Sequence, residues 1–170
     1  VQVRHGLMVV GETLAAKSNI IHTLATAMSS IENHPDFCNV TVRTMNPKSI
    51  TSGQLYGDFD ENTHEWSDGI LAIVYRQCSK AKIEDGRQWI VFDGPVDTLW
   101  IESLNTVLDD NKTLCLANSE RIKLPPSIHM MFEVEDLKVA SPATVSRCGM
   151  VYMETVHVGT RALCESWALS

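Results

Sequence analysis

The sequence predicts an α/β protein whose parallel sheet of about five strands is covered by helices on both faces. Short apolar runs that end in glycine or a polar residue alternate with segments whose apolar residues have helical spacing. Strands separated in this way by helices pair in parallel and are buried on both sides. The length of 170 residues suits one domain with a sizeable core.

Local patterns predict each element in turn. A buried strand at His5–Gly11 precedes a helix that starts at Lys17 and repeats its apolar residues every three or four positions. The tail after Glu154 begins another helix, so we expect the chain to be part of a longer protein. The other predicted elements are a strand at Val40–Asn46, a long loop at Pro47–Trp66, a helix at Ser67–Ala81 capped by Ser67 or Asp68, a strand at Gln88–Gly94, a helix at Val96–Asp110, a hairpin at Thr113–Leu124 turning at Asn118–Ser119, a strand at His129–Val134, a short helix at Ser141–Cys148 with Pro142 in its first turn, and a strand at Met150–Glu154.

Composition excludes several classes of function. The net charge is -7 and lysines and arginines form no run, which argues against a nucleic-acid surface. No apolar stretch is long enough to span a membrane. The five cysteines form no C-x-x-C pair, so we expect reduced thiols rather than a disulfide framework or a zinc site.

The segment from Gly11 to Asn19 nearly matches the phosphate-binding loop G-x-x-x-x-G-K-[ST]. In such a loop backbone N–H groups surround the phosphates, the lysine reaches the β- and γ-phosphates, and the next hydroxyl binds Mg²⁺. Ala16 replaces the second glycine, and a Cβ there costs about 1–2 kcal/mol if φ is positive. We expect weakened nucleotide binding; the alternative is a plain strand–turn–helix with a surface lysine. The predicted loop contacts are Gly11, Glu12, Thr13, Leu14, Ala15, Ala16, Lys17, Ser18 and Asn19.

A second strand ends in Asp93, which we expect to hold Mg²⁺ together with Ser18. Gly94 stands where ATP hydrolases of this architecture carry a glutamate that polarises the attacking water. Asp97 is interpreted as a helix cap or first-turn acid rather than a substitute base. Glu133 lies where a neutral residue usually senses the γ-phosphate; its carboxylate either faces and repels the phosphate or points away toward a neighbour.

Four longer motifs carry a resemblance to one family: "NPKSITSGQLYGDFD", "HEWSDGILA", "WIVFDGPVDTLWIESLNTVLDDNKTLCL" and "ASPATVSRCGMVYME". They resemble the second AAA+ module of a dynein heavy chain of the axonemal (ciliary) type, from about Val3 to Glu154. The resemblance implies a P-loop NTPase (AAA+) fold in which residues 1–154 form the large nucleotide-binding subdomain. Residues 155–170 would then begin the connection to a helical lid that this chain lacks.

The resemblance also implies a function. The module would bind ATP or ADP with Mg²⁺ without hydrolysing it, inside a ring of AAA+ modules in a microtubule motor of the cytoplasm, cytoskeleton and ciliary axoneme. Adjacent modules of the heavy chain would be its direct partners, and microtubules and dynein light and intermediate chains would be partners of the parent protein. Neither nucleic acid nor membrane is expected as a partner.

Arg147 ends the short helix before the last strand, which is the place of the arginine finger in AAA+ rings. By resemblance it would act on the neighbouring module's γ-phosphate; the alternative is a surface salt bridge. Two other functions remain open for the module as a whole. It could be a purely structural ring segment that binds no nucleotide, or an active ATPase, against which Gly94 argues.

Overall fold

The computed structural model describes residues 5–31, 38–80 and 86–169. The predicted helix end at Ala81 and the start of the predicted large subdomain, residues 1–4, lie outside these ranges. The elements of the described chain are β1 (Gly6–Val10), α1 (Lys17–Ser30), β2 (Val40–Met45), α2 (Ser52–Tyr56), β3 (Gly57–Phe59), β4 (Trp66–Asp68), α3 (Ile70–Lys80), β5 (Arg87–Asp93), α4 (Thr98–Glu102), α5 (Asn105–Leu108), β6 (Thr113–Cys115), β7 (Arg121–Lys123), β8 (Ile128–Val134), α6 (Pro142–Arg147), β9 (Cys148–Tyr152) and α7 (Thr155–Leu169).

The main sheet has five strands in the order β2-β5-β8-β1-β9, and every neighbouring pair is parallel. The predicted parallel five-stranded sheet is therefore confirmed. Because all strands point the same way, the loops after β1, β5 and β8 meet at one edge of the sheet. We call this the carboxyl edge, which is where α/β proteins bind ligands.

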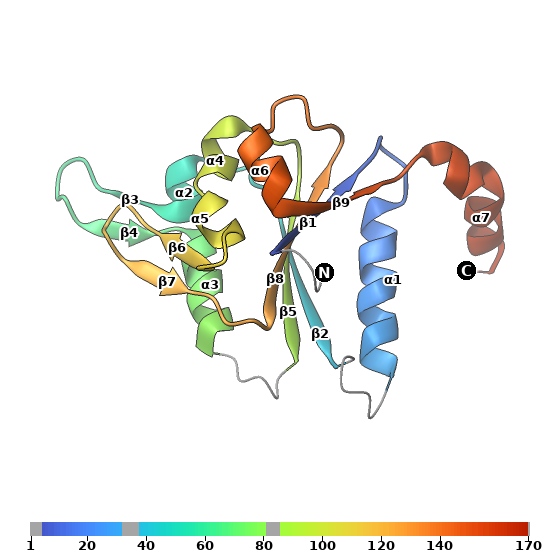
Figure 1. Cartoon of the computed structure of the whole chain (residues 1–170), viewed down its shortest axis with the longest axis horizontal. Coiled ribbons are helices and arrows are strands. Elements are labelled where there is room, and N and C mark those ends of the chain that lie inside the picture. The colour runs from blue at the N-terminus through green and yellow to red at the C-terminus, as the bar shows by residue number, and fades with distance from the viewer. Residues whose placement is uncertain (1–4, 32–37, 81–85, 170) are drawn as a thin grey trace.

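Two separate cores lie on the two faces of the sheet, because alternate residues of each strand point to opposite sides. The smaller core places Val9, Val91 and Met131 against Ile21 and Ala25 of α1. The larger core lies against α3, α4 and α5, with the two hairpins on the same side of the sheet (Figure 1). Helices therefore cover both faces, as predicted.

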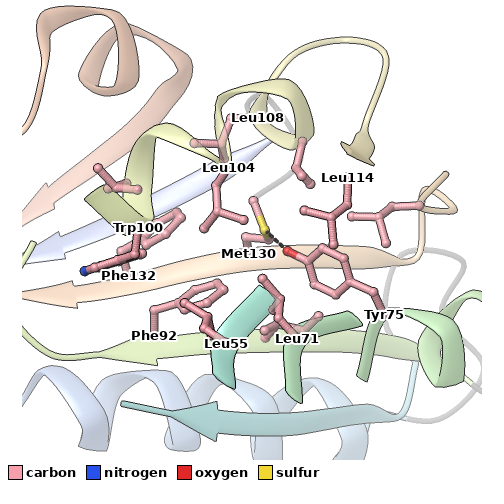
Figure 2. Packing of buried hydrophobic residues seen from close by; sticks show 14 of the residues in the cluster. Leu55, Leu71, Tyr75, Phe92, Trp100, Leu104, Leu108, Leu114, Met130 and Phe132 are labelled. Atoms are coloured by element: carbon pink, nitrogen blue, oxygen red, sulfur yellow. Dashed lines mark hydrogen bonds between the residues drawn. The ribbon is translucent and has the colours of Figure 1, made fainter. Parts of the chain in front are cut away.

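Aromatic stacking forms the centre of the larger core. The ring of Phe92 stacks on Trp100 and Phe132, with centroids 5.6 Å and 5.2 Å apart. Figure 2 shows these rings at one end of the cluster and Tyr75 at the other, where its hydroxyl points at the Met130 sulfur 2.6 Å away. Trp100 belongs to this core, and its side chain is almost fully buried. Trp89 is fully buried as well, in the core on the other face.

The predicted loop at Pro47–Trp66 is wrong in part, because it contains helix α2 and the antiparallel hairpin β3–β4. A capping box starts α2: the Thr51 hydroxyl accepts from the Gln54 N–H, and the Gln54 side chain accepts from the Thr51 N–H. Phe59 packs edge-to-face on Trp66 across the hairpin, with centroids 5.1 Å apart. The capping box was a readable signal, whereas the hairpin depends on cross-strand contacts.

The predicted cap of the next helix is also wrong, because Ser67 and Asp68 belong to β4 and α3 begins at Ile70. Asp68 instead accepts two hydrogen bonds from Arg76, at 2.5 Å and 2.9 Å. Arg76 also binds Glu120 at 2.6 Å. These pairs lower the pKa of Asp68 and of Glu120, and they tie the hairpins β3–β4 and β6–β7 to α3.

The predicted single helix at Val96–Asp110 is divided into α4 and α5. The backbone turns tightly at the break, where the Leu104 N–H bonds to the Ile101 carbonyl at 3.0 Å. Leu104 and Ile101 are both fully buried, and Leu108 of α5 packs into the same core. Burial of apolar side chains from both segments outweighs the helical continuity that periodicity predicted.

The remaining element predictions are confirmed with small shifts of boundary. Residues 113–124 form the hairpin β6–β7, with Ser119 at positive φ in its turn. Ser141 caps α6 and Pro142 occupies its first turn. Helix α7, which has a non-helical kink at Gly159, lies beyond α1 in Figure 1.

Two further properties concern the whole described chain. All five cysteines are free, and burial raises the pKa of the Cys148 thiol to about 12. Among the described residues, no helix is long and apolar enough to cross a membrane.

Candidate functional site

The loop between β1 and α1 lies at the carboxyl edge and is held there by backbone contacts. The Gly11 N–H bonds to the Val134 carbonyl at 3.1 Å. A Cβ on Gly11 would meet the Met153 carbonyl oxygen at 2.2 Å, so this position accepts only glycine without backbone movement. The first glycine of the motif is thus required by the close passage of the chain after β9.

Ala16, at the second glycine position of the motif, has the positive φ at which the sequence predicts backbone strain. Ala16 caps α1 with φ 60° and ψ 27°, in the left-handed region, and its side chain makes no capping bond. Leu14 also has a positive φ, and its side chain is exposed, whereas Ala15 is fully buried beneath the loop. The strain at Ala16 costs about 1–2 kcal/mol, and glycine would avoid it.

Lys17 lies across the loop and binds its backbone. The ammonium Nζ donates to the carbonyl oxygens of Gly11 at 2.7 Å and of Glu12 at 2.8 Å. Glu12 and Thr13 have exposed side chains, and so do Ser18 and Asn19 in the first turn of α1. The loop residues predicted from the motif are thus brought together around one turn, with Lys17 folded onto it.

Ser18 contacts a residue 115 positions further along the chain. Its hydroxyl donates to the Glu133 carboxylate at 2.6 Å, and Glu133 is only 4% exposed. Of the two orientations considered for Glu133, the structure has the carboxylate turned toward the loop. Ser18 was predicted as a ligand of Mg²⁺ and Glu133 as a residue near the γ-phosphate, but the sequence did not predict that the two side chains are in contact.

Asp93 ends β5 and pairs in register with Glu133 on β8, so both acids lie at the carboxyl edge. Gly94 follows, and its N–H bonds to the Glu133 carbonyl at 3.2 Å. A Cβ on Gly94 would lie 2.9 Å from Asn46 Oδ1. Asn46 directly follows β2, and sequence reasoning did not predict its close approach to Gly94.

Asp97 directly precedes α4, and its carbonyl accepts the Ile101 N–H at 3.2 Å. This is the geometry of a helix start, so the predicted position of Asp97 at the helix N-terminus is confirmed.

Arg147 ends α6 and directly precedes the edge strand β9. Its Nε donates to the Asp109 carboxylate and its Nη1 to the Ala143 carbonyl at 2.8 Å. The side chain is 32% exposed. Arg147 therefore forms a partly exposed ion pair within the chain, and the sequence did not indicate Asp109 as its partner.

Magnesium is the cation that a nucleotide-binding loop of this kind implies. The Ser18 hydroxyl and the carboxylates of Asp93 and Glu133 are the hard oxygen ligands that Mg²⁺ prefers. These residues fit the cation, and Ser18 and Asp93 would hold it. In the described ranges, histidine, cysteine and acidic side chains form no group of three placed to hold a metal ion by themselves.

A strand–loop–helix with a lysine and a hydroxyl at the carboxyl edge of a parallel sheet defines the P-loop class of α/β nucleotide-binding modules. A family model described as "AAA domain (dynein-related subfamily)" matches residues 6–148. The chain belongs to this family, and its resemblance to axonemal dynein heavy chains is confirmed.

Three relatives show the extent of the likeness. The chain is 54% identical over 167 residues to Dynein axonemal heavy chain 12 of Mus musculus, covering 97% of this chain and 5% of the relative. It is 54% identical over 170 residues to Dynein axonemal heavy chain 1 of Rattus norvegicus, and 50% identical over 169 residues to Dynein axonemal heavy chain 6 of Homo sapiens. Both alignments cover 97% of this chain and 4% of the relative. The chain thus spans about one twentieth of the length of these heavy chains.

Proposed function

We propose that the chain is a regulatory AAA module of an axonemal dynein heavy chain, and that it binds ATP or ADP with Mg²⁺ without hydrolysing it. One observation carries the proposal. The carboxyl edge keeps Lys17, Ser18 and Asp93, while the position of the catalytic glutamate is Gly94, closely approached by Asn46. The groups that bind phosphate and Mg²⁺ are present, and the group that would activate water is missing.

The chain's own residues have separate tasks in this function. Lys17 would exchange the carbonyls of Gly11 and Glu12 for phosphate oxygens, and the N–H groups at the start of α1 would donate to the same anion. Mg²⁺, when bound, supplies charge neutralisation of the phosphates. The backbone strain at Ala16 weakens phosphate binding by the loop but leaves the Lys17 ammonium and the N–H donors in place.

The axonemal names of the relatives indicate the cytoskeleton and the axoneme of cilia as the location of the parent protein. Its partners there would be the adjacent AAA modules of the same chain, together with microtubules and light and intermediate chains. We further propose that Arg147 leaves Asp109 in the assembled ring and acts as a finger on the neighbouring module. The support for this is its place at the end of α6 and its partial exposure.

A titration with fluorescent ATP in Mg²⁺ tests nucleotide binding. Lys17→Ala should lower the affinity by roughly 10- to 100-fold, because hydrogen bonds to charged groups are worth about 1.5–3 kcal/mol. Lys123→Ala, which removes an exposed lysine on the hairpin β6–β7, is the matched control and should bind like the wild type. Binding that Lys17→Ala leaves unchanged would contradict the assignment of the loop.

The alternative is a structural ring segment that binds no nucleotide. The backbone strain at Ala16 and the hydrogen bond that ties the Ser18 hydroxyl to Glu133 favour this alternative. Absence of any titration signal would support it. A measurement of phosphate release decides the third possibility. We expect no turnover above background, and turnover that Lys17→Ala abolishes would refute the non-hydrolysing assignment.

A further inference from the structure

The contact between Ser18 and Glu133 joins the phosphate loop to the central strand β8. The donor is the hydroxyl that follows the motif lysine, and the acceptor is a carboxylate that is 4% exposed, with 2.6 Å between the oxygens. Val9 and Asp93 are the register neighbours of Glu133 on the two adjacent strands. The sheet therefore holds this carboxylate close to the loop.

Glu133 is a buried acid whose charge has no cationic partner in the described part of the chain. None of the ion pairs among residues 5–31, 38–80 and 86–169 includes it. The ammonium of Lys17 donates to two loop carbonyls instead. A buried carboxylate without a counter-charge costs free energy, and a neutral hydroxyl compensates for it only in part.

A nucleotide in the loop would place phosphate charge close to this carboxylate. In phosphate loops the hydroxyl at the Ser18 position binds the Mg²⁺ that contacts the phosphates. Glu133 is one hydrogen bond away from that hydroxyl, so it repels a phosphate that arrives without a cation. A divalent cation between the two anions turns this repulsion into attraction and provides the missing counter-charge.

We propose that Glu133 makes nucleotide binding at this loop dependent on Mg²⁺. Without the cation, Glu133 holds the Ser18 hydroxyl and excludes free nucleotide; with it, the hydroxyl is released to the metal and Glu133 balances the charge. This extends the proposed function, because it assumes that the loop binds nucleotide at all. Through Glu133, the loop would bind nucleotide that carries Mg²⁺ in preference to free nucleotide.

The test is a titration of the whole 170-residue chain with fluorescent ATP, once in Mg²⁺ and once in EDTA. Glu133→Gln removes the charge and keeps an oxygen that can accept from Ser18. It should raise the affinity for metal-free nucleotide at least about tenfold, equivalent to about 1.4 kcal/mol, and change the affinity in Mg²⁺ much less. Glu61→Gln, at an exposed acid in the β3–β4 turn, is the control and should keep the wild-type ratio of the two affinities.

The outcomes separate this proposal from the proposed function. If the wild type binds in Mg²⁺ and Glu133→Gln keeps its ratio within twofold, this proposal is wrong and nucleotide binding stands. If Glu133→Gln binds and the wild type does not bind even in Mg²⁺, Glu133 excludes nucleotide with or without the cation, and both this proposal and the proposed function are wrong. If no variant binds in either condition, both fail. Circular dichroism checks folding, and Glu133→Met, of similar length and without charge, repeats the test if Glu133→Gln is unfolded.

Discussion

Gly94 is the position at which a restored glutamate would be expected to create an ATPase, and we expect the substitution to fail. A Cβ on Gly94 would lie 2.9 Å from Asn46 Oδ1 and 3.4 Å from Asn46 Cγ. Asn46 Oδ1 is held in place, because it accepts the Lys48 N–H at 2.9 Å. A new side chain must displace Asn46, so the carboxylate of Gly94→Glu starts from a distorted position and phosphate release should stay at background.

The smaller change Gly94→Ala measures the free-energy cost of the overlap between a Cβ at this position and the Asn46 side chain. Displacing Asn46 sacrifices its hydrogen bond to Lys48, which contributes about 0.5–1.5 kcal/mol. Replacing a glycine stabilises by about 0.4–1 kcal/mol through the unfolded state where the backbone permits it. Gly94→Ala alone should therefore change the stability by between a gain of about 0.5 kcal/mol and a loss of about 1 kcal/mol, and a loss of that size lowers the Tm by at most about 4 °C in a chain of this size.

The same change in an Asn46→Ala background should be more favourable and should stabilise the chain. The obstruction and the hydrogen bond are then both absent, so Gly94→Ala should stabilise by about 0.4–1 kcal/mol. Urea unfolding of the two single variants, the double variant and the wild type gives a coupling free energy, which we expect near about 1 kcal/mol. Additivity within about 0.3 kcal/mol would show that Asn46 does not obstruct Gly94. ATP turnover by Gly94→Glu that depends on Lys17 would show that the position is open.

Two other predictions concern Arg147 and His129. In a motor that contains this module, Arg147→Ala should lower ATP turnover by about 10³–10⁵-fold. Arg147→Lys should restore the turnover only partly, because a planar guanidinium suits phosphate better than an ammonium. If Arg147→Ala keeps turnover within about twofold of the wild type, Arg147 is not a finger and serves only in its partly exposed ion pair with Asp109. Burial lowers the pKa of His129 from 6.5 to about 4, so only the unfolded chain takes up its proton as the pH falls through this window. The free energy of unfolding should then decline by up to roughly 3 kcal/mol between about pH 6.5 and 4. The midpoint of urea unfolding should fall less steeply across this range in His129→Asn than in the wild type. An equal fall in the two proteins would show that His129 is not the source of the pH dependence.

Much of the fold could be predicted because its signals are local. Apolar runs ending in Gly11 and Gly94, separated by segments of helical spacing, indicate a parallel sheet before any contact is known. The motif lysine and hydroxyl likewise predict a phosphate loop, and Asp93 followed by Gly94 predicts a site without a catalytic base. Chemistry carried by adjacent residues is visible in the sequence itself.

The tertiary structure decided which distant residues meet. Ser18 and Glu133 are 115 positions apart, and only the placement of β8 beside β1 brings them within a hydrogen bond. The pairing of Arg147 with Asp109 and the approach of Asn46 to Gly94 depend in the same way on elements far apart in the chain. Periodicity determines which face of a strand or helix is apolar, but the free energy of packing selects the neighbour, and packing depends on the whole chain at once.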